Sequence, residues 1–256
     1  MKFPIVLVCT LFISLLMPAP ANTASSARIV TGDVIANRSV TLATRIMGRI
    51  TRVHASEGDV VNDGQVIVEI DDTEYRARLK STEAAEDRAQ AELAHRKRIK
   101  NRLEQLVSSN AIAQDVIDEA TYRLEVARAN LKMAQADIET IRSTLAETQI
   151  RVPFDAVVIR KFAETGLVTQ PGEPLYEIQD QSRLKFRARV KERDLAHIKL
   201  DDMARITITA LGDEPVSATV IRIIPHGDER HTFIIELSLP NKPGLYPGMF
   251  GKAVFQ

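Results

Sequence analysis

Two stretches of this chain decide its fold. Residues 48–72 read GRITRVHASEGDVVNDGQVIVEIDD, and residues 156–180 read AVVIRKFAETGLVTQPGEPLYEIQD. Aligned without gaps at an offset of 108, they share eight identical pairs, whereas unrelated segments of ordinary composition would share roughly one or two. The identical pairs are Arg52/Arg160, Ala55/Ala163, Gly58/Gly166, Val60/Val168, Gly64/Gly172, Glu69/Glu177, Ile70/Ile178 and Asp72/Asp180. The chain therefore contains an internal repeat.

Each copy of the repeat is expected to form a strand, a turn and a second strand, because β-rich apolar positions alternate with turn residues. Two glycines six residues apart flank a short strand in each copy and suit turns that need a positive φ angle. These turn glycines are Gly58 and Gly64 in the first copy and Gly166 and Gly172 in the second. A half-unit of this size cannot bury a face alone, so the two copies are predicted to pack as one compact β-sandwich.

The segment between the copies, residues 73–150, contains neither proline nor glycine and is rich in strong helix formers. In its second half, apolar residues alternate spacings of three and four over four repeats, which is typical of a coiled coil. These residues are Ile117, Ala120, Leu124, Ala127, Leu131, Ala134, Ile138, Ile141 and Leu145. In the first half, Glu86, Arg96 and Lys100 interrupt the apolar seam. Because residues 108–111 read as a turn, we predict an antiparallel helical hairpin.

The residues after Asp180 alternate apolar and polar side chains, first over 184–190 and again over 204–208. Further short strands are expected at 217–224, 232–239 and 252–255, with helical turns within 192–198. Regular short strands separated by turns indicate a small antiparallel β-barrel, which we expect residues 28–44 to complete.

The N-terminus has the pattern of a secretory signal. Lys2 precedes an apolar run over residues 3–17, and small residues follow as far as Ala27. The run is short of the roughly 20 apolar residues that span a bilayer. Export with cleavage of the signal is therefore expected, and an uncleaved anchor is the alternative. Cys9, the only cysteine, lies inside the run, so cleavage would leave no cysteine for disulfides or metal binding.

The half-motifs, in this order around a long helical insertion, resemble the HlyD-like membrane fusion protein family, whose members are periplasmic adaptor subunits. Lipoyl and biotinyl carrier domains look similar in these half-motifs. The resemblance runs from about Val30 to Phe255. It rests on residues 48–67, Arg151–Asp155, Gly166–Leu175 and Gly244–Met249. One residue departs from the pattern, since Ala156 stands where the family's second half usually has glycine.

The resemblance implies a mixed β and α fold, in which a split lipoyl-like β-sandwich with an inserted antiparallel α-helical coiled-coil hairpin is followed by a small antiparallel β-barrel domain. Hinges are expected at the domain junctions near residues 72, 151 and 182. The expected boundaries are a signal peptide at 1–24, N-terminal strand material of the barrel at 28–44, lipoyl-like halves at 45–72 and 151–181, the helical hairpin at 73–150 and the β-barrel domain at 182–256.

The same resemblance implies a function without catalysis. It implies a periplasmic adaptor of a tripartite efflux or secretion system, which links an inner-membrane transporter to a TolC-like outer-membrane channel. A transporter of the resistance-nodulation-division (RND) type is favoured, because the N-terminus looks like a removable signal, and drug-exporting ABC and major-facilitator transporters are the alternatives. Such adaptors are associated with the inner membrane and pack side by side, usually as hexameric rings. The alternative is a periplasmic coiled-coil scaffold without a role in transport.

The hairpin tip is the candidate site for docking on the channel. Adaptors of the resembling family that dock on TolC-type channels carry the motif Arg-x3-Leu-x6-Ser across the hairpin tip. This chain has Arg102 and Leu106 at the first two positions and Ala113 in place of the serine. Without the serine hydroxyl, one hydrogen bond is lost, typically worth about 0.5–1.5 kcal/mol. This loss affects the expected identity of the channel more than the expectation that the tip docks. Five basic residues near the tip form either a solvated helix face or a surface for an acidic partner. They are Arg96, Lys97, Arg98, Lys100 and Arg102.

Other chemistries find little support in the sequence. A nucleic-acid binder is not indicated, because 34 basic residues balance 34 acidic ones and only 5% of residues are aromatic. The helical insertion occupies the place of a carrier lysine, and the nearest lysine, Lys80, would lie inside a helix. His226 and His231 flank Asp228 and Glu229, but a loop between strands explains them as well as a metal site does. We therefore expect no cofactor, no metal and no enzymatic activity.

Overall fold

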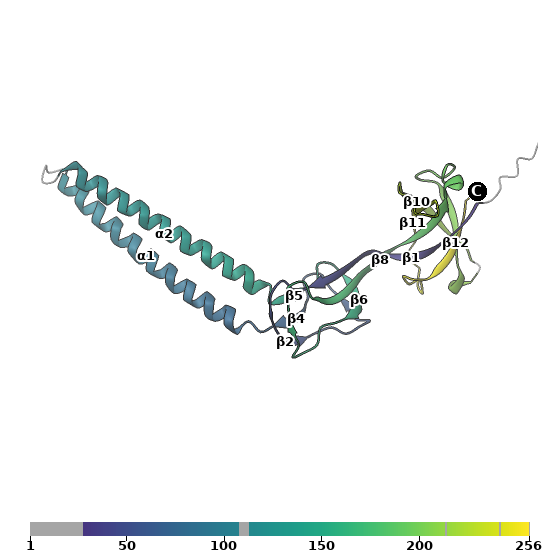
Figure 1. The fold of residues 1–256 in the computed structure, drawn as a ribbon, viewed down its shortest axis with the longest axis horizontal. Helices are drawn as coiled ribbons and strands as arrows, with labels where there is room; N and C mark the ends of the chain where they lie inside the picture. Colours follow the sequence, from purple (N-terminus) through teal and green to yellow (C-terminus); the bar gives the residue numbers. More distant parts are fainter. Residues whose placement is uncertain (1–27, 108–112, 213, 241, 256) are drawn as a thin grey trace, which may run out of the picture.

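The computed structural model describes residues 28–255 except 108–112, 213 and 241. The described chain forms a helical arm, a β-sandwich and a β-barrel, which follow one another along the long axis of the molecule (Figure 1). The expected signal peptide at 1–24 and the expected turn at 108–111 lie outside the described residues. In the part of the chain that is described, no helix is both long and apolar enough to cross a membrane.

The β-sandwich contains two sets of four strands. One is the sheet β5-β4-β2-β7, and the other is formed by β1, β8, β6 and β3. The strands are β1 (Arg28–Ala43), β2 (Gly48–Val53), β3 (Val60–Val61), β4 (Val66–Ile70), β5 (Gln149–Arg151), β6 (Ala156–Lys161), β7 (Val168–Thr169) and β8 (Pro174–Lys191). Side chains from both sets fill a shared core, in which Ile50, Ile67 and Tyr176 are among the largest fully buried residues.

The internal repeat appears in the structure as a reciprocal exchange of hydrogen bonds between the two halves. Gly58 donates its backbone N–H to the carbonyl oxygen of Val158 at 2.9 Å. The residues 108 positions away repeat this bond, since Gly166 donates to Ile50 at 2.8 Å. All four turn glycines have positive φ angles between 75° and 91°, which residues with a Cβ rarely adopt. Each half therefore closes its turns on the strands of the other half.

The β-barrel closes from six strands in the order β1-β12-β9-β10-β11-β8, because β8 also pairs with β1. The strands that belong to the barrel alone are β9 (Met203–Ile208), β10 (Val216–Ile224), β11 (Thr232–Ser238) and β12 (Phe250–Phe255). A single helical turn, α3 (Glu192–Leu195), follows β8, and a 3₁₀ turn, η1 (Thr209–Leu211), follows β9. Phe186, Ile206 and Leu237 lie fully buried in the barrel core. The expected antiparallel barrel is confirmed.

Strand β1 serves both the barrel and the sandwich, which differs from the assignment of residues 28–44 to the barrel. Its first part, Arg28–Asp33, pairs with β12, whereas residues 38–43 pair with the part of β8 that lies in the sandwich. Leu42 packs against the sandwich core and pairs with Tyr176, as its repeat equivalent Ile150 pairs with β4. The structural repeat therefore extends upstream of the stretch in which residue identity reveals it, because strand pairing tolerates different apolar side chains.

Strands β1 and β8 run unbroken from the sandwich into the barrel as a two-stranded ribbon (Figure 1). The hinge expected near residue 182 thus falls inside β8 rather than in a loop. Asp180 lies within this ribbon with only 5% of its side chain exposed. Its carboxylate accepts hydrogen bonds from the Asn37 amide at 2.8 Å, from Arg38 at 3.3 Å and from the Ser182 backbone at 3.0 Å. Hydrogen bonds along and across the ribbon join the two domains.

Candidate functional site on the helical arm

The helical arm consists of α1 (Thr73–Val107) and α2 (Gln114–Ala146), which lie side by side and run in opposite directions (Figure 1). The apolar stripe predicted on α2 forms its packed face. Its buried residues are Ala120, Leu124, Ala127, Ala134, Ile138 and Ile141. On α1, a half-buried seam with alternating spacings of four and three includes the polar residues that interrupt its apolar pattern. This seam consists of Tyr75, Leu79, Thr82, Glu86, Ala89, Leu93, Arg96, Lys100 and Leu103.

Two polar contacts cross the arm along this seam. Glu86 accepts a hydrogen bond from the Gln135 amide at 3.1 Å, and Arg142 lies 3.4 Å from the carboxylate of Glu83. These contacts use residues that a purely apolar seam would exclude. At Glu83 and Glu86, α1 thus contacts α2 through polar groups.

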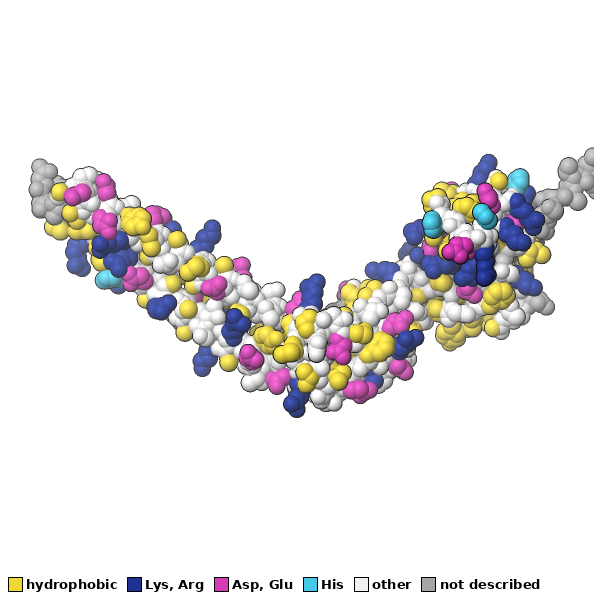
Figure 2. All heavy atoms as spheres, in the orientation of Figure 1, with side chains coloured by type: hydrophobic (Ala, Val, Ile, Leu, Met, Phe, Trp, Pro, Cys, Tyr) yellow, Lys and Arg dark blue, Asp and Glu magenta, His cyan; other side chains and the backbone are white. Residues whose placement is uncertain are grey.

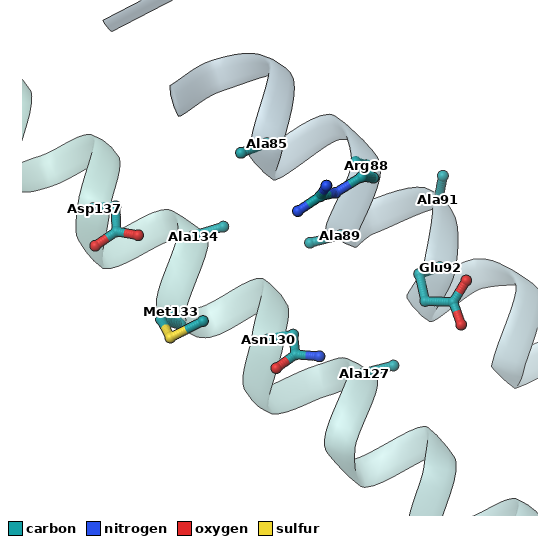
Figure 3. A pocket seen from close by; sticks show the side chains of 10 residues that line it. All are labelled: Ala85, Arg88, Ala89, Ala91, Glu92, Ala127, Asn130, Met133, Ala134 and Asp137. Carbon is teal, nitrogen blue, oxygen red and sulfur yellow. The ribbon is translucent and has the colours of Figure 1, made fainter. Parts of the chain in front are cut away.

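The arm also has grooves that its heptad pattern alone does not predict. A groove of about 700 Å³ lies between the two helices. Alanines of α1 face alanines of α2 across it (Figure 3). Met133 lies at its edge with 63% of its surface exposed. A second groove, of about 350 Å³, lies nearer the tip between Ile99, Leu103 and Val116. Small side chains at packed positions leave this space, and spaced alanines are the sequence signal for it.

The candidate docking residues lie at the free end of the arm. Arg102 is exposed near the end of α1, and Leu106, one turn further on, is 41% exposed. Ala113 is also exposed and directly precedes α2. The structure thus places all three at the same end of the arm, although the segment that joins the helices lies outside the described residues. An exposed leucine beside an exposed arginine can contact a partner through both an apolar and a charged group.

Ala113 occupies the N-cap position of α2. Its backbone is extended, with φ −78° and ψ 155°, and its side chain makes no capping hydrogen bond. The motif Arg-x3-Leu-x6-Ser has serine at this position. Serine is a preferred N-cap residue because its hydroxyl oxygen accepts a hydrogen bond from a backbone N–H of the first helical turn. A serine at this position would therefore be placed to cap this chain's own helix.

Ion pairs within α1 neutralise part of the basic run. Arg96 lies 2.6 Å from Glu92, and Lys100 lies 2.6 Å from Glu104, each one helical turn away. The remaining three basic residues of the run are exposed: Lys97, Arg98 and Arg102. Exposed pairs of this kind contribute little stability, typically about 0.3–0.5 kcal/mol each. The positive charge available to a partner is thus concentrated on three exposed side chains.

The loop with His226 and His231 is held by its own acidic residue. Asp228 accepts hydrogen bonds from the Thr232 hydroxyl at 2.6 Å and from the Arg230 backbone at 2.9 Å. The Thr232 bonds are the main cause of a lowered pKa of Asp228. Among the residues that the structure describes, no three histidine, cysteine or acidic side chains lie close enough to hold a metal ion.

The first copy of the repeat passes directly into the arm. β4 ends at Ile70 and α1 begins at Thr73, whose hydroxyl donates a 2.6 Å hydrogen bond to Asp71. Lys80 lies inside α1 and is exposed. The hairpin turn on which a carrier domain presents its lysine is thus replaced here by the start of a long helix.

This architecture defines a protein built on a barrel-sandwich hybrid, with a helical arm inserted between its halves and a β-barrel beside it. The family model for CzcB-like barrel-sandwich hybrid domains matches residues 38–180, and the model for CusB-like β-barrel domains matches residues 186–256. The first match alone covers more than half of the chain. The chain therefore belongs to the membrane fusion proteins, the family of the periplasmic adaptors.

Two curated relatives are similar in sequence to parts of this chain. Uncharacterized protein YdhJ of Escherichia coli K12 is 27% identical over 169 residues, which cover 66% of this chain and 59% of YdhJ. Multidrug resistance protein MdtA of Yersinia enterocolitica is 28% identical over 158 residues, which cover 59% of this chain and 36% of MdtA. The chain thus spans between about a third and three fifths of the length of these curated relatives. The crystal structure of MacA from Actinobacillus actinomycetemcomitans shares the fold, with a TM-score of 0.79 at 21% identity over 90% of this chain and 78% of MacA.

Proposed function

We propose that this protein is the periplasmic adaptor of a tripartite efflux or secretion system, with its arm acting as an antiparallel coiled-coil hairpin that reaches toward an outer-membrane channel. One observation carries the proposal. The arm projects from one side of the sandwich, and the barrel, in which Arg28 at the start of β1 pairs with Phe255, lies on the other side (Figure 1). The apolar segment at residues 3–17 precedes the barrel, so an uncleaved anchor there would hold the barrel toward the inner membrane and the arm away from it. A cleaved signal would deliver the same elongated chain to the periplasm without holding it in place.

The dimensions of the arm support a bridging role. The 33 residues of α2 span about 50 Å at a helical rise of 1.5 Å per residue. An arm of this length extends contacts far beyond the sandwich without requiring a large domain. The names of relatives agree with efflux, since MdtA is named for multidrug resistance.

The partners that we propose follow from this orientation. The barrel and the lipoyl-like halves, residues 45–72 and 151–181, face an inner-membrane transporter of the RND type and pack side by side in a hexameric ring. The arm tip, with Arg102, Leu106 and Ala113, docks on a TolC-like channel. Residues 1–24 direct the chain to the periplasm. No covalent chemistry on the substrate is required of the adaptor in this role.

In-cell photocrosslinking tests the proposal. A photoreactive amino acid replaces Leu106, and the trapped partner is identified by mass spectrometry. We expect an outer-membrane channel as the main adduct. The matched control is the same probe at Val126, which is 41% exposed like Leu106 but lies in the middle of α2. Capture of other envelope proteins from Leu106 would favour a periplasmic scaffold without transport, and equal capture from both positions would remove the special role of the tip.

A further inference from the structure

Strand β8 carries a stripe of basic side chains on the outer wall of the barrel and ribbon. Buried residues alternate along the strand with exposed or half-buried cations, so the cations share one face. This basic stripe consists of Arg183, Lys185, Arg187, Arg189 and Lys191. On the side of the barrel seen in Figure 2, Lys and Arg side chains gather with Asp and Glu side chains among them. Five like charges along one strand repel one another, so their arrangement favours contact with opposite charge.

A row of alternating charges crosses the stripe at Arg187. Strand pairing places Asp33 of β1, Arg187 of β8, Glu236 of β11 and Arg222 of β10 side by side. Arg187 lies 3.1 Å from one carboxylate oxygen of Glu236, and Arg222 lies 3.6 Å from the other. The Glu236 side chain is only 5% exposed, whereas both arginines remain largely exposed. The buried Glu236 carboxylate thus positions the guanidinium groups of Arg187 and Arg222. Each guanidinium has further N–H donors that can bind a partner.

A hollow of about 560 Å³ opens beside this row, where the barrel meets the ribbon. Its charged lining consists of the cations Arg38, Lys185, Arg187 and Arg222 and the anions Asp33 and Glu236. Both anions already have cationic neighbours, since Asp33 lies 3.7 Å from Arg189 and Glu236 lies between two arginines. Arg38 is paired with Asp180 of the ribbon. The positive charge that the hollow offers beyond its ion pairs therefore comes from Lys185 and from the remaining N–H groups of Arg187 and Arg222.

We propose that the hollow and the basic stripe form a docking site for carboxylate side chains on an acidic surface of a partner protein. Guanidinium groups held in a fixed orientation match carboxylates through two parallel hydrogen bonds. A concave site admits protruding side chains, whereas a bilayer is flat and attracts basic segments without requiring fixed arginine geometry. Strand β8, which carries the stripe, runs from the sandwich into the barrel along the ribbon (Figure 1). The identity of the partner as the inner-membrane transporter rests on the proposed function. The preference for carboxylates rests on the geometry of the hollow and of the Arg187–Glu236–Arg222 row.

The direct test measures binding of a defined acidic probe to the purified chain. The probe is a fluorescent peptide of about twelve residues in which glutamate alternates with serine, and its neutral counterpart has glutamine in place of glutamate. At physiological ionic strength we expect the glutamate peptide to bind about tenfold tighter, because charge-assisted hydrogen bonds are about twice as strong as neutral ones. Fluorescence anisotropy gives both affinities.

The decisive variant removes the whole row without leaving a buried charge unpaired. It combines Arg187→Gln, Arg222→Gln and Glu236→Gln, because removing the arginines alone would leave the Glu236 carboxylate buried without its partners. This triple variant lowers the net charge by one. Arg205→Gln makes the same change on β9, which lies three strands from β8 in either direction around the barrel. We expect the triple variant to lose the preference for glutamate and Arg205→Gln to stay within about twofold of the parent chain.

A second variant keeps the test informative if the triple variant does not fold. Lys185→Gln removes one cation from the hollow and leaves the Glu236 row intact, so we expect the glutamate peptide to bind several-fold more weakly. Equal losses in Lys185→Gln and Arg205→Gln would show that net charge alone attracts the probe and would overturn the proposal. The proposal would also be overturned if the glutamate peptide did not bind the parent chain. Sedimentation of the chain with phosphatidylglycerol-containing vesicles, without peptide binding, would indicate a membrane surface as the partner instead.

The outcome also separates this inference from the adaptor role. Failure of peptide binding together with channel capture from Leu106 would remove the docking site on the barrel and leave the adaptor function standing. Peptide binding without channel capture would keep the docking site and refute the bridging role of the arm.

Discussion

At the residue scale, Asp180 shows how one carboxylate joins two domains. Burial opposes its charged form, but hydrogen bonds from Ser182, Asn37 and Arg38 outweigh that effect and lower the pKa of Asp180 from 3.8 to about 2. Arg38 also lies 4.1 Å above the ring of Phe154, so the network connects the ribbon to the sandwich core. A carboxyl group with a lower pKa in the folded than in the unfolded chain stabilises the fold above its unfolded pKa.

The replacement Asp180→Asn is expected to lower the free energy of unfolding by about 2 kcal/mol at pH 7, since a shift of one pKa unit corresponds to about 1.4 kcal/mol. This contribution is present above about pH 4 and is lost as the pH falls toward 2, so the two proteins should converge in acid. Urea unfolding across this pH range measures the effect. Asp72→Asn is the matched control, because Asp72 is the repeat equivalent of Asp180 but pairs with the exposed Arg76. A similar loss in both variants would contradict a special role of the ribbon network.

Sequence identity did not distinguish these two aspartates. Asp72 and Asp180 are one of the eight identical pairs of the repeat, yet the chain enters a helix after the first and continues as a strand after the second. The difference arises from Asn37 and Arg38, which are more than 140 residues away along the chain. Only the pairing of β1 with β8 brings them to Asp180.

At the scale of the element, α2 begins without a side-chain cap. The extended backbone of Ala113 has the geometry in which a serine hydroxyl reaches the N–H of Asp115 or Val116. The Asp115 carboxylate already accepts the Val116 N–H at 3.0 Å, which partly satisfies this helix end. The start of α2 therefore lacks the side-chain cap that a serine would supply.

The replacement Ala113→Ser is expected to stabilise the start of α2 by about 1 kcal/mol through N-capping. Hydrogen exchange of the first-turn amides measures the gain as slower exchange. Ala136→Ser, at an exposed position within α2, adds the same hydroxyl where no free N–H is available and should destabilise the helix slightly. If both variants slowed exchange equally, capping would not be the cause. Stronger crosslinking to a channel from Leu106 in Ala113→Ser, with unchanged exchange, would instead assign the hydroxyl to the partner.

At the scale of the whole molecule, the ribbon determines how the barrel sits on the sandwich. β1 and β8 pair from Thr31 with Arg189 to Ala43 with Pro174, with only two irregularities in register. Gly32 allows the closest approach of these strands, because a Cβ atom there would lie 2.2 Å from the Arg187 carbonyl oxygen. A continuous antiparallel pair resists bending more than a loop does, since bending breaks ladder hydrogen bonds.

Spin labels at Asp63 in the sandwich and Lys252 in the barrel should therefore give one narrow distance distribution by pulsed electron paramagnetic resonance. Both positions are exposed and lie outside the ribbon. Gly32→Ala should broaden or shift this distribution, because the new methyl group meets backbone that can yield only by separating the strands. Gly212→Ala is a control for the loss of a barrel glycine, as its Cβ would meet nothing within 4 Å, although its positive φ predicts some loss of stability. A broad distribution in the parent chain would support a hinge near residue 182 instead.

Local sequence patterns were enough to predict the repeat, the helical insertion and the antiparallel barrel. Glycines such as Gly58 and Gly166, the seam around Leu124 and Ile138, and the alternation over residues 184–190 are local patterns, and each follows from the periodicity of one element. The reach of β1 into both domains, the Asp180 network and the Arg187–Glu236–Arg222 row depended on tertiary structure. These features join strands that lie far apart in the chain, and side chains acquire their partners only after the strands have paired.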